Sequence, residues 1–363
     1  MEKQVYYDDI AVGMELPKLT KGPWSMSHIV RWSAAQENWE RKVNDYRYAT
    51  KYEGLTDVVI SGNWKKYVLA QLFKDWAGHG GWLWKLSIRY QKSHFPGDMV
   101  IAWAKVSKKY EVNGLGFVEM DCGIRNQNEE ETTPSWATVV LPLRGGNEVP
   151  YPFVPPPGIE HRSLFQKGAT IEKPLYITDE VRSYIGKEVE VEAWDEVCKS
   201  ELRRFSQAIP DPDPLYWDEQ YAQQTKFGTL VAPPLYPLDS FKIPPNMSDT
   251  LTEGIEKDPN FWGGAPGDPR IKLRIPLPLL SINAGAEFEI LQLAHLGQKI
   301  VVRARITDIY EKEGKSGRIV FCVYDYEFKN KEGDIILKVR RWHARWRAHR
   351  EDTSKDWETI DKE

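Results

Sequence analysis

Residues 64–90 read WKKYVLAQLFKDWAGHGGWLWKLSIRY, and this stretch decides the fold. In its first part the large apolar side chains recur at the spacing of a helix, at Trp64, Tyr67, Val68, Leu72 and Trp76. Glycines at 78 and 80 suit the end of a helix. From residue 82 to residue 90, apolar side chains occupy alternate positions, which is typical of a half-buried strand. We therefore predict an apolar helix followed directly by a strand.

Further strand-like runs follow, and the same order of elements recurs later in the chain. The runs are 99–110, 116–125 and 135–143 in the first half, and 299–310, 317–329 and 334–347 in the second. One offset of 200 residues aligns Gly97 with Gly297, Tyr110 with Tyr310, Gly114 with Gly314, and Cys122 with Cys322. Several matches at a single offset indicate an internal duplication.

The duplication predicts how the chain is divided. Nearer the start of each half the matching offset is 173, between 45–49 and 218–222, so the two offsets differ by 27 residues. We place these extra residues in the Pro- and Gly-rich stretch 244–278, as a long loop with short helical pieces. The predicted units are a first domain at 1–147, a Pro/Gly-rich linker at 148–165, a second domain at 166–350 and a charged tail at 351–363. Each domain is of the α+β class, an antiparallel sheet wrapped around a central helix.

Composition excludes several classes of function. The 363 residues include 49 Lys and Arg against 53 Asp and Glu, a net charge of −4. A dedicated nucleic-acid-binding protein normally has a basic surplus, so we expect no nucleic-acid partner. The three cysteines are far apart and the seven histidines show no ligand spacing, so we expect neither a disulfide scaffold nor a metal site. No apolar run reaches the ~18 residues of a membrane helix, and we expect a cytoplasmic protein with no membrane partner.

Motifs in both halves resemble one family. The first half contains YDDIAVG at 7–13, GLTDVVISG at 54–62 and PGD at 96–98, and it resembles a MaoC-like hotdog domain. The second half contains RFSQAIPDPDPLY at 204–216, GTLVAPP at 228–234 and NAG at 283–285, and it resembles the N-terminal dehydratase domain of the same superfamily. The resemblance, to MaoC-like acyl dehydratases and (R)-specific enoyl-CoA hydratases, implies a tandem (double) hotdog fold.

The resemblance also implies an activity on acyl thioesters. The family typically adds water reversibly to a 2-enoyl-CoA and so forms a 3-hydroxyacyl-CoA. Coenzyme A is then part of the substrate, the acyl-CoA thioester is the small-molecule partner, and no further cofactor is expected. In the family an Asp/His dyad activates the water, and a backbone amide at the start of the central helix polarises the thioester carbonyl. A homodimer of double hotdogs is the assembly that the resemblance allows.

The residues for acid–base chemistry depart from the family pattern. That pattern is Asp-x-Asn-Pro-x-His followed by x-Asp. The positions of the Asp and the His hold Asn38 and Val43 in the first half, and Asp211 and Tyr216 in the second. Valine cannot transfer a proton, and tyrosine is a poor base near neutral pH. Our candidate catalytic side chains are Asp211, Tyr216 and Asn38; the alternatives are that Asp211 forms a turn or caps a helix and that Tyr216 only packs.

The start of the apolar helix is the second candidate feature. The amide of Gly62 can approach a ligand closely, and a helix N-terminus favours developing negative charge on an oxygen, so Gly62 is our candidate oxyanion amide. Its neighbours Ser61, Asn63 and Trp64, together with Trp39, are candidate substrate-binding residues; ordinary turn formation and core packing are the alternatives. In the second half the equivalent positions hold prolines, which lack an N–H. We therefore expect one working site, built on the first half's helix and completed by the second half.

Three functions stay open at this point. The first is an acyl-thioester hydro-lyase with a degenerate Asp/His dyad. The second is a non-catalytic acyl-CoA-binding protein, or a partner subunit of another hotdog protein, which the missing histidines would explain. The third is a thioesterase.

Overall fold

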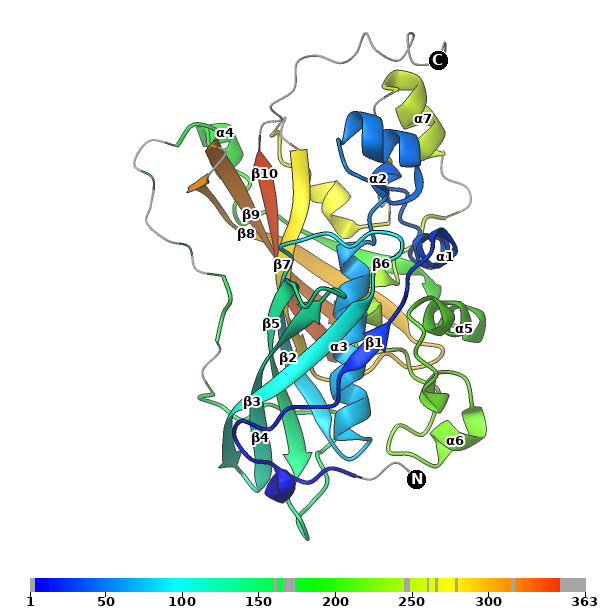
Figure 1. Ribbon diagram of the computed structural model, residues 1–363, viewed down its shortest axis with the longest axis vertical. Helices are drawn as coiled ribbons and strands as arrows, with labels where there is room; N and C mark the ends of the chain where they lie inside the picture. The colour runs from blue at the N-terminus through cyan, green and yellow to red at the C-terminus, as the bar shows by residue number, and fades with distance from the viewer. Residues whose placement is uncertain are drawn as a thin grey trace.

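Ten strands form one continuous antiparallel sheet in the computed structural model, in the order β1-β3-β4-β5-β2-β7-β10-β9-β8-β6 (Figure 1). The structure describes residues 4–159, 162–165, 167, 171, 174–244, 249–259, 261–264, 267–277, 280–314 and 317–346. The strands of the first half are β1 (Leu19–Lys21), β2 (Trp82–Arg89), β3 (Val100–Val112), β4 (Leu115–Arg125) and β5 (Glu131–Pro142). Those of the second half are β6 (Glu188–Glu196), β7 (Leu280–Ile290), β8 (Lys299–Gly314), β9 (Gly317–Lys329) and β10 (Ile335–Trp346).

Each half contributes five strands in the same spatial order, which confirms the predicted duplication. The order β1-β3-β4-β5-β2 becomes β6-β8-β9-β10-β7, and the halves meet where β2 pairs with β7. At that seam Ser87 lies opposite Glu287, its own counterpart at the offset of 200. Both long first strands are interrupted at the same point, between Val106 and Lys108 in β3 and between Ile306 and Asp308 in β8. The α+β double hotdog fold is therefore confirmed.

The offset of 200 does not hold beyond the first hairpin of each half. Tyr110 stacks on Phe117 with ring centroids 5.5 Å apart, and Tyr310 stacks on Phe321 at 5.3 Å. The β8–β9 hairpin of the second half is therefore four residues longer than the β3–β4 hairpin of the first half. Cys122 and Cys322 are consequently not equivalent positions, and their alignment in the sequence was wrong.

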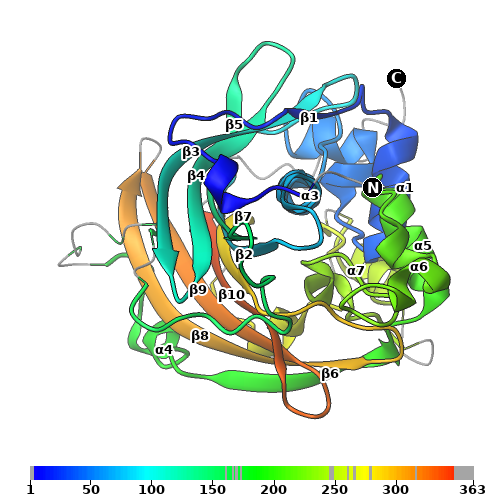
Figure 2. The ribbon, with the colours of Figure 1, turned by 90° about the horizontal axis from the view of Figure 1, so that it is seen from below.

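The central helix of the first half is α3 (Gly62–Ala77). It lies on the concave side of the sheet, and most of its circumference is buried, including the core side chains Trp64, Tyr67, Val68, Leu69 and Phe73 (Figure 2). Gly78, at φ 65°, ends it in a conformation that glycine adopts without strain. Two helices, α1 (Met26–Gln36) and α5 (Lys199–Ala208), lie on the side of α3 that faces away from the sheet. The offset of 173 relates these two helices to each other.

The second half departs from the expectation of a central helix in each half. At the place equivalent to α3, the described residues contain only the short η4 (Tyr236–Asp239). Prolines at 233, 234 and 237 explain the difference, because a proline inside a helix removes a hydrogen bond and clashes with the preceding turn. Tyr67 of α3 instead donates to the carbonyl oxygen of Leu235, at 2.9 Å. One helix therefore serves both halves.

The predicted insertion at 244–278 contains α7 (Thr250–Lys257) and η5 (Pro269–Leu273). It packs on the first half, where the amide of Trp39 donates to Gly264 at 2.7 Å and that of Arg41 donates to Trp262 at 2.9 Å. The remaining short helices are η1 (Tyr7–Asp9), α2 (Arg41–Asn44), η2 (Tyr48–Tyr52), α4 (Asp179–Arg182), η3 (Pro214–Tyr216) and α6 (Glu219–Gln223).

The segment predicted as a linker is held against the fold. Phe153 is buried, and its amide donates to the carbonyl of Leu291 at 2.8 Å. The exact domain boundaries stay a prediction. The predicted charged tail at 351–363 lies outside the described residues.

Candidate functional site

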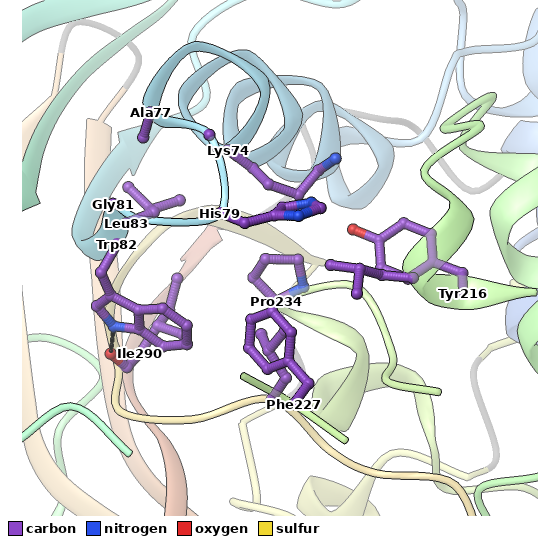
Figure 3. A pocket seen from close by; sticks show the side chains of 13 residues that line it. Lys74, Ala77, His79, Gly81, Trp82, Leu83, Tyr216, Phe227, Pro234 and Ile290 are labelled. Carbon is purple, nitrogen blue, oxygen red and sulfur yellow. Dashed lines mark hydrogen bonds between the residues drawn. The ribbon is translucent and has the colours of Figure 1, made fainter. Parts of the chain in front are cut away.

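A small, partly open pocket lies where the two halves meet at the C-terminal end of α3. Its walls come from that helix end, the start of β2, the end of β7 and the segments around Tyr216 and Pro234 (Figure 3). Most of the lining is apolar, and the indole of Trp82 donates to the carbonyl of Ile290 at 2.8 Å. The polar side chains that line it are Lys74, His79 and Tyr216.

The segment Asp211-Pro212-Asp213-Pro214 forms a tight turn beside this pocket. Asp213 caps η3 by accepting from the amide of Leu215 at 3.0 Å, and Asp211 accepts from the amide of Asp213 at 3.3 Å. The turn-forming role considered for these aspartates is therefore present. Because proline fixes its own backbone and restricts the residue before it, the turn holds both carboxyl groups in defined positions.

Both carboxyl groups meet Lys74, which lies in the last turn of α3. Its ammonium nitrogen is 2.6 Å from Oδ2 of Asp213, 3.4 Å from Oδ1 of Asp211 and 2.6 Å from Oδ1 of Asp75. Burial opposes the positive charge of Lys74, but the three carboxylates outweigh it and raise the pKa of the lysine. Lys74 is thus a permanent cation that joins the two halves.

The two neighbouring aspartates differ in their acidity. Burial raises the pKa of Asp211, and the attraction of Lys74 does not fully offset it. Burial acts on Asp213 in the same direction, but the neighbouring His79 imidazole and the charge and hydrogen bond of Lys74 outweigh it and hold the pKa of Asp213 well below its usual range. Two carboxyl groups whose environments push their pKa values apart are the usual arrangement for separate acid and base roles. Asp213 is the fixed anion, and Asp211 is the carboxyl that can hold a proton.

Tyr216, at the family's His position, is buried with its ring at the pocket. The ammonium of Lys74 lies 5.5 Å from the ring centroid. Burial, followed by the charges of Asp211 and Asp213, raises the pKa of Tyr216 well above its usual value, so its hydroxyl keeps its proton. The Asp211 side chain is only 3% exposed and does not line the pocket, but it contacts Lys74, which does.

The structure adds two residues that the sequence did not single out, Lys74 and His79. His79 is the second residue after α3, its side chain is 30% exposed, and its Nε2 lies 3.7 Å from Oδ2 of Asp213. The hydroxyl of Tyr221 lies 3.2 Å from its Nδ1. The sequence does show His79 between Gly78 and Gly80 at the predicted helix end. Nothing near it in the sequence indicated that it would meet Asp213 and Tyr221, more than 130 residues away.

The other predicted site residues lie at the opposite end of α3. A rise of about 1.5 Å per residue separates the two ends of this helix by roughly 20 Å. There Asn63 accepts from Asn283 at 3.2 Å, and Gly62 lies beside the ring of Tyr90, at van der Waals distance for an added Cβ. The expectation of one site built from Ser61, Gly62, Asn63, Asp211 and Tyr216 is therefore corrected, because α3 holds these groups apart.

Three further predicted site residues, Trp64, Asn38 and Trp39, do not line this pocket. Trp64 is fully buried, packs edge-on against Trp24 and donates to the carbonyl of Ala208 at 3.3 Å, so it belongs to the core. Asn38 is buried and accepts from the amide of Glu40 at 3.0 Å, which is a local turn contact. Trp39 lines a separate surface groove with residues of α1, α2 and α7.

Among the described residues, no three His, Cys, Asp or Glu side chains converge as metal ligands would. None of the helices in the described part of the chain is both long and apolar enough to cross a membrane.

Comparison with known proteins agrees with this architecture. A family model described as the FAS1-like dehydratase domain region matches residues 183–339. A UPF0336 protein of Thermobifida fusca (strain YX) is 37% identical over 57 residues, which are 16% of this chain and 38% of that protein. The chain thus spans well under half of this curated relative.

Solved structures of low sequence identity share the fold. A protein described as a MaoC domain dehydratase from Chloroflexus aurantiacus J-10-fl has a TM-score of 0.67 at 10% identity, over 96% of this chain and 99% of that one. A conserved protein of Mycobacterium tuberculosis, described as a double hotdog, has a TM-score of 0.53 at 10% identity, over 94% and 99%.

Fold, strand order and the shared helix define a double hotdog protein. Residues 183–339 match the dehydratase family model, and the whole fold is similar to that of a protein described as a MaoC domain dehydratase, in agreement with the resemblance of the motifs.

Proposed function

We propose that this protein catalyses the reversible hydration of a 2-enoyl-CoA to a 3-hydroxyacyl-CoA in the pocket beside Asp211. The observation that carries the proposal is the pair Asp211 and Asp213. These carboxyl groups have opposite pKa shifts and share one lysine, Lys74, which lines an apolar pocket. They also occupy the segment where the family keeps its dyad. The match of this half to a dehydratase domain supports the same reaction class.

In this proposal the acyl chain lies along the apolar wall formed by Trp82, Leu83 and Ile290. Asp211 stores the proton for the α-carbon, and Tyr216, which lines the pocket and keeps its own proton, delivers it. Lys74 keeps both carboxyl groups in place during the transfer. Coenzyme A takes part only as the carrier of the acyl group.

The test follows the loss of the conjugated enoyl absorbance with short, long, branched and aromatic 2-enoyl-CoA thioesters. The wild type should consume at least one of them, and Asp211→Asn should lower kcat/KM about 100-fold or more, the usual contribution of a general acid. Asp218→Asn is the matched control, because asparagine can still cap α6 as Asp218 does. Consumption of none of the thioesters, or an Asp211→Asn variant as active as the wild type, would contradict the proposal.

One observation favours a second function, acyl-thioester binding without turnover. Asp211 is almost completely enclosed and does not reach the pocket surface itself. Titration with a saturated acyl-CoA distinguishes the two functions when it accompanies the activity assay: binding with no loss of enoyl absorbance identifies a binding protein. Release of free thiol in the same assay would identify a thioesterase instead.

A further inference from the structure

We propose that His79, contributed by the first half, is the general base of the site and replaces the histidine whose family position Tyr216 occupies. This inference rests on the proposed function. The dyad would then be assembled across the two halves, His79 from the end of α3 and Asp213 from the turn before η3, rather than within one motif. Asp213 is the positioning residue of the pair.

The place of His79 suits a base. Histidine is the side chain most often used to move protons near neutral pH. His79 lines the pocket and is 30% exposed, so it can meet both a substrate and a water molecule. In the view of Figure 3 its ring lies between Lys74 and Pro234 and points toward Tyr216.

The loop that carries His79 is held in place on both sides of the histidine. Gly78 adopts a positive φ of 65°, which turns the chain sharply out of α3. The amide of Gly80 donates to Oε1 of Gln4 at 2.9 Å, and that of Gly81 donates to Gly78 at 3.2 Å. The imidazole is therefore presented by fixed backbone.

The neighbours of His79 orient the ring. The low pKa of Asp213 keeps a negative charge 3.7 Å from Nε2, which favours the tautomer with a proton on Nε2 and leaves Nδ1 as the acceptor. Nδ1 faces the hydroxyl of Tyr221 at 3.2 Å. Tyr221 is 37% exposed, and in the proposed step a water molecule takes the place of its hydroxyl beside Nδ1.

The proton balance follows from these positions. Nδ1 of His79 takes one proton from water as the water oxygen bonds to the β-carbon, and the α-carbon receives a proton from Asp211 through Tyr216. The imidazolium is then stabilised by Asp213. Loss of the His79 proton to solvent and uptake of one by Asp211 restore the enzyme, so the net change is the addition of one water across the double bond.

The experiment compares His79→Gln with the wild type in steady-state hydration of a 2-enoyl-CoA. We expect kcat to fall about 100-fold or more while KM stays within about threefold, as for the loss of a general base. Added imidazole should partly restore activity to His79→Ala, which a merely structural role would not allow. His295→Gln is the matched control, because His295 is also half-buried and hydrogen-bonded to a tyrosine but does not line the pocket.

The outcomes separate the two proposals. An active wild type with His79→Gln within about threefold of its kcat would overturn the base role alone and leave the proposed function standing. No turnover by the wild type on any thioester would overturn the proposed function, and the base role with it.

Discussion

Asp211 and Asp213 show how two identical side chains acquire different chemistry from their contacts. Both are buried and both touch Lys74, but Asp213 also lies beside His79 and accepts from the amide of Leu215. The sequence identified Asp211 and Tyr216 because they lie in a recognisable motif. It did not identify Lys74 or His79, because their partners are 130 to 140 residues away and meet them only after the halves have joined.

Lys74→Met tests this cluster at the residue scale. Removing the cation leaves two buried carboxyl groups facing each other, so we expect unfolding free energy to fall by about 3–5 kcal/mol at pH 7. The lowered pKa of Asp213 stabilises the wild type above the ordinary aspartate pKa and ceases to do so as pH falls through its folded value. The loss of unfolding free energy in Lys74→Met should therefore be smaller at pH 4.5 than at pH 7, because the carboxyl groups that repel each other in the variant become protonated.

Urea unfolding at the two pH values measures that difference. Lys92→Met is the control, because Lys92 forms an exposed ion pair with Glu130 that should contribute at most about 1 kcal/mol. A deficit for Lys74→Met that is the same at both pH values would show that the carboxyl groups are not its cause.

At the scale of elements, α3 is the feature that the sequence predicted best. Its apolar spacing indicated a buried helix over 64–76, and the structure places it at 62–77. The matching helix of the second half was predicted from the duplication and is absent from the described residues, because that copy has prolines at 233, 234 and 237. A repeat preserves strand order more readily than a helix that one substitution to proline can break.

Two adjacent lysines of α3 give the prediction at this scale. Lys65 and Lys66 are both about fully buried, but Lys66 lies 3.0 Å from Asp239, whereas the Lys65 ammonium donates to the carbonyl of Lys92 at 2.8 Å. Burial lowers the pKa of Lys65 to about 7, with Asp98 opposing it only weakly. Between pH 7 and pH 10.5 the unfolded chain binds more protons at this site, so wild-type stability should rise by about 1.4 kcal/mol per pH unit from this group.

Lys65→Met should therefore be more stable than the wild type at pH 7, and its advantage should decline as the pH is raised to 9.5. Lys66→Met should be less stable than the wild type at pH 7, because Asp239 would lose its cation. Chemical unfolding of both variants at the two pH values provides the comparison. Equal destabilisation by both substitutions would contradict the account of these charges.

At the scale of the whole molecule, the sheet seam between β2 and β7 brings chemistry from the two halves to one place. Both halves line the pocket, with Lys74, His79 and Trp82 from the first half and Tyr216, Phe227 and Ile290 from the second. The duplication and the class of fold were readable from residue spacing. The location of the site was not, because the sequence offered two candidate segments and only the packing of α3 shows that they are far apart.

The most direct test of the central claim is a crystal structure of the slow His79→Gln variant with a 2-enoyl-CoA bound. The account predicts the acyl double bond beside residue 79 and Tyr216, with the chain against Trp82 and Ile290. An acyl group bound at the other end of α3, beside Gly62 and Asn63, would contradict it.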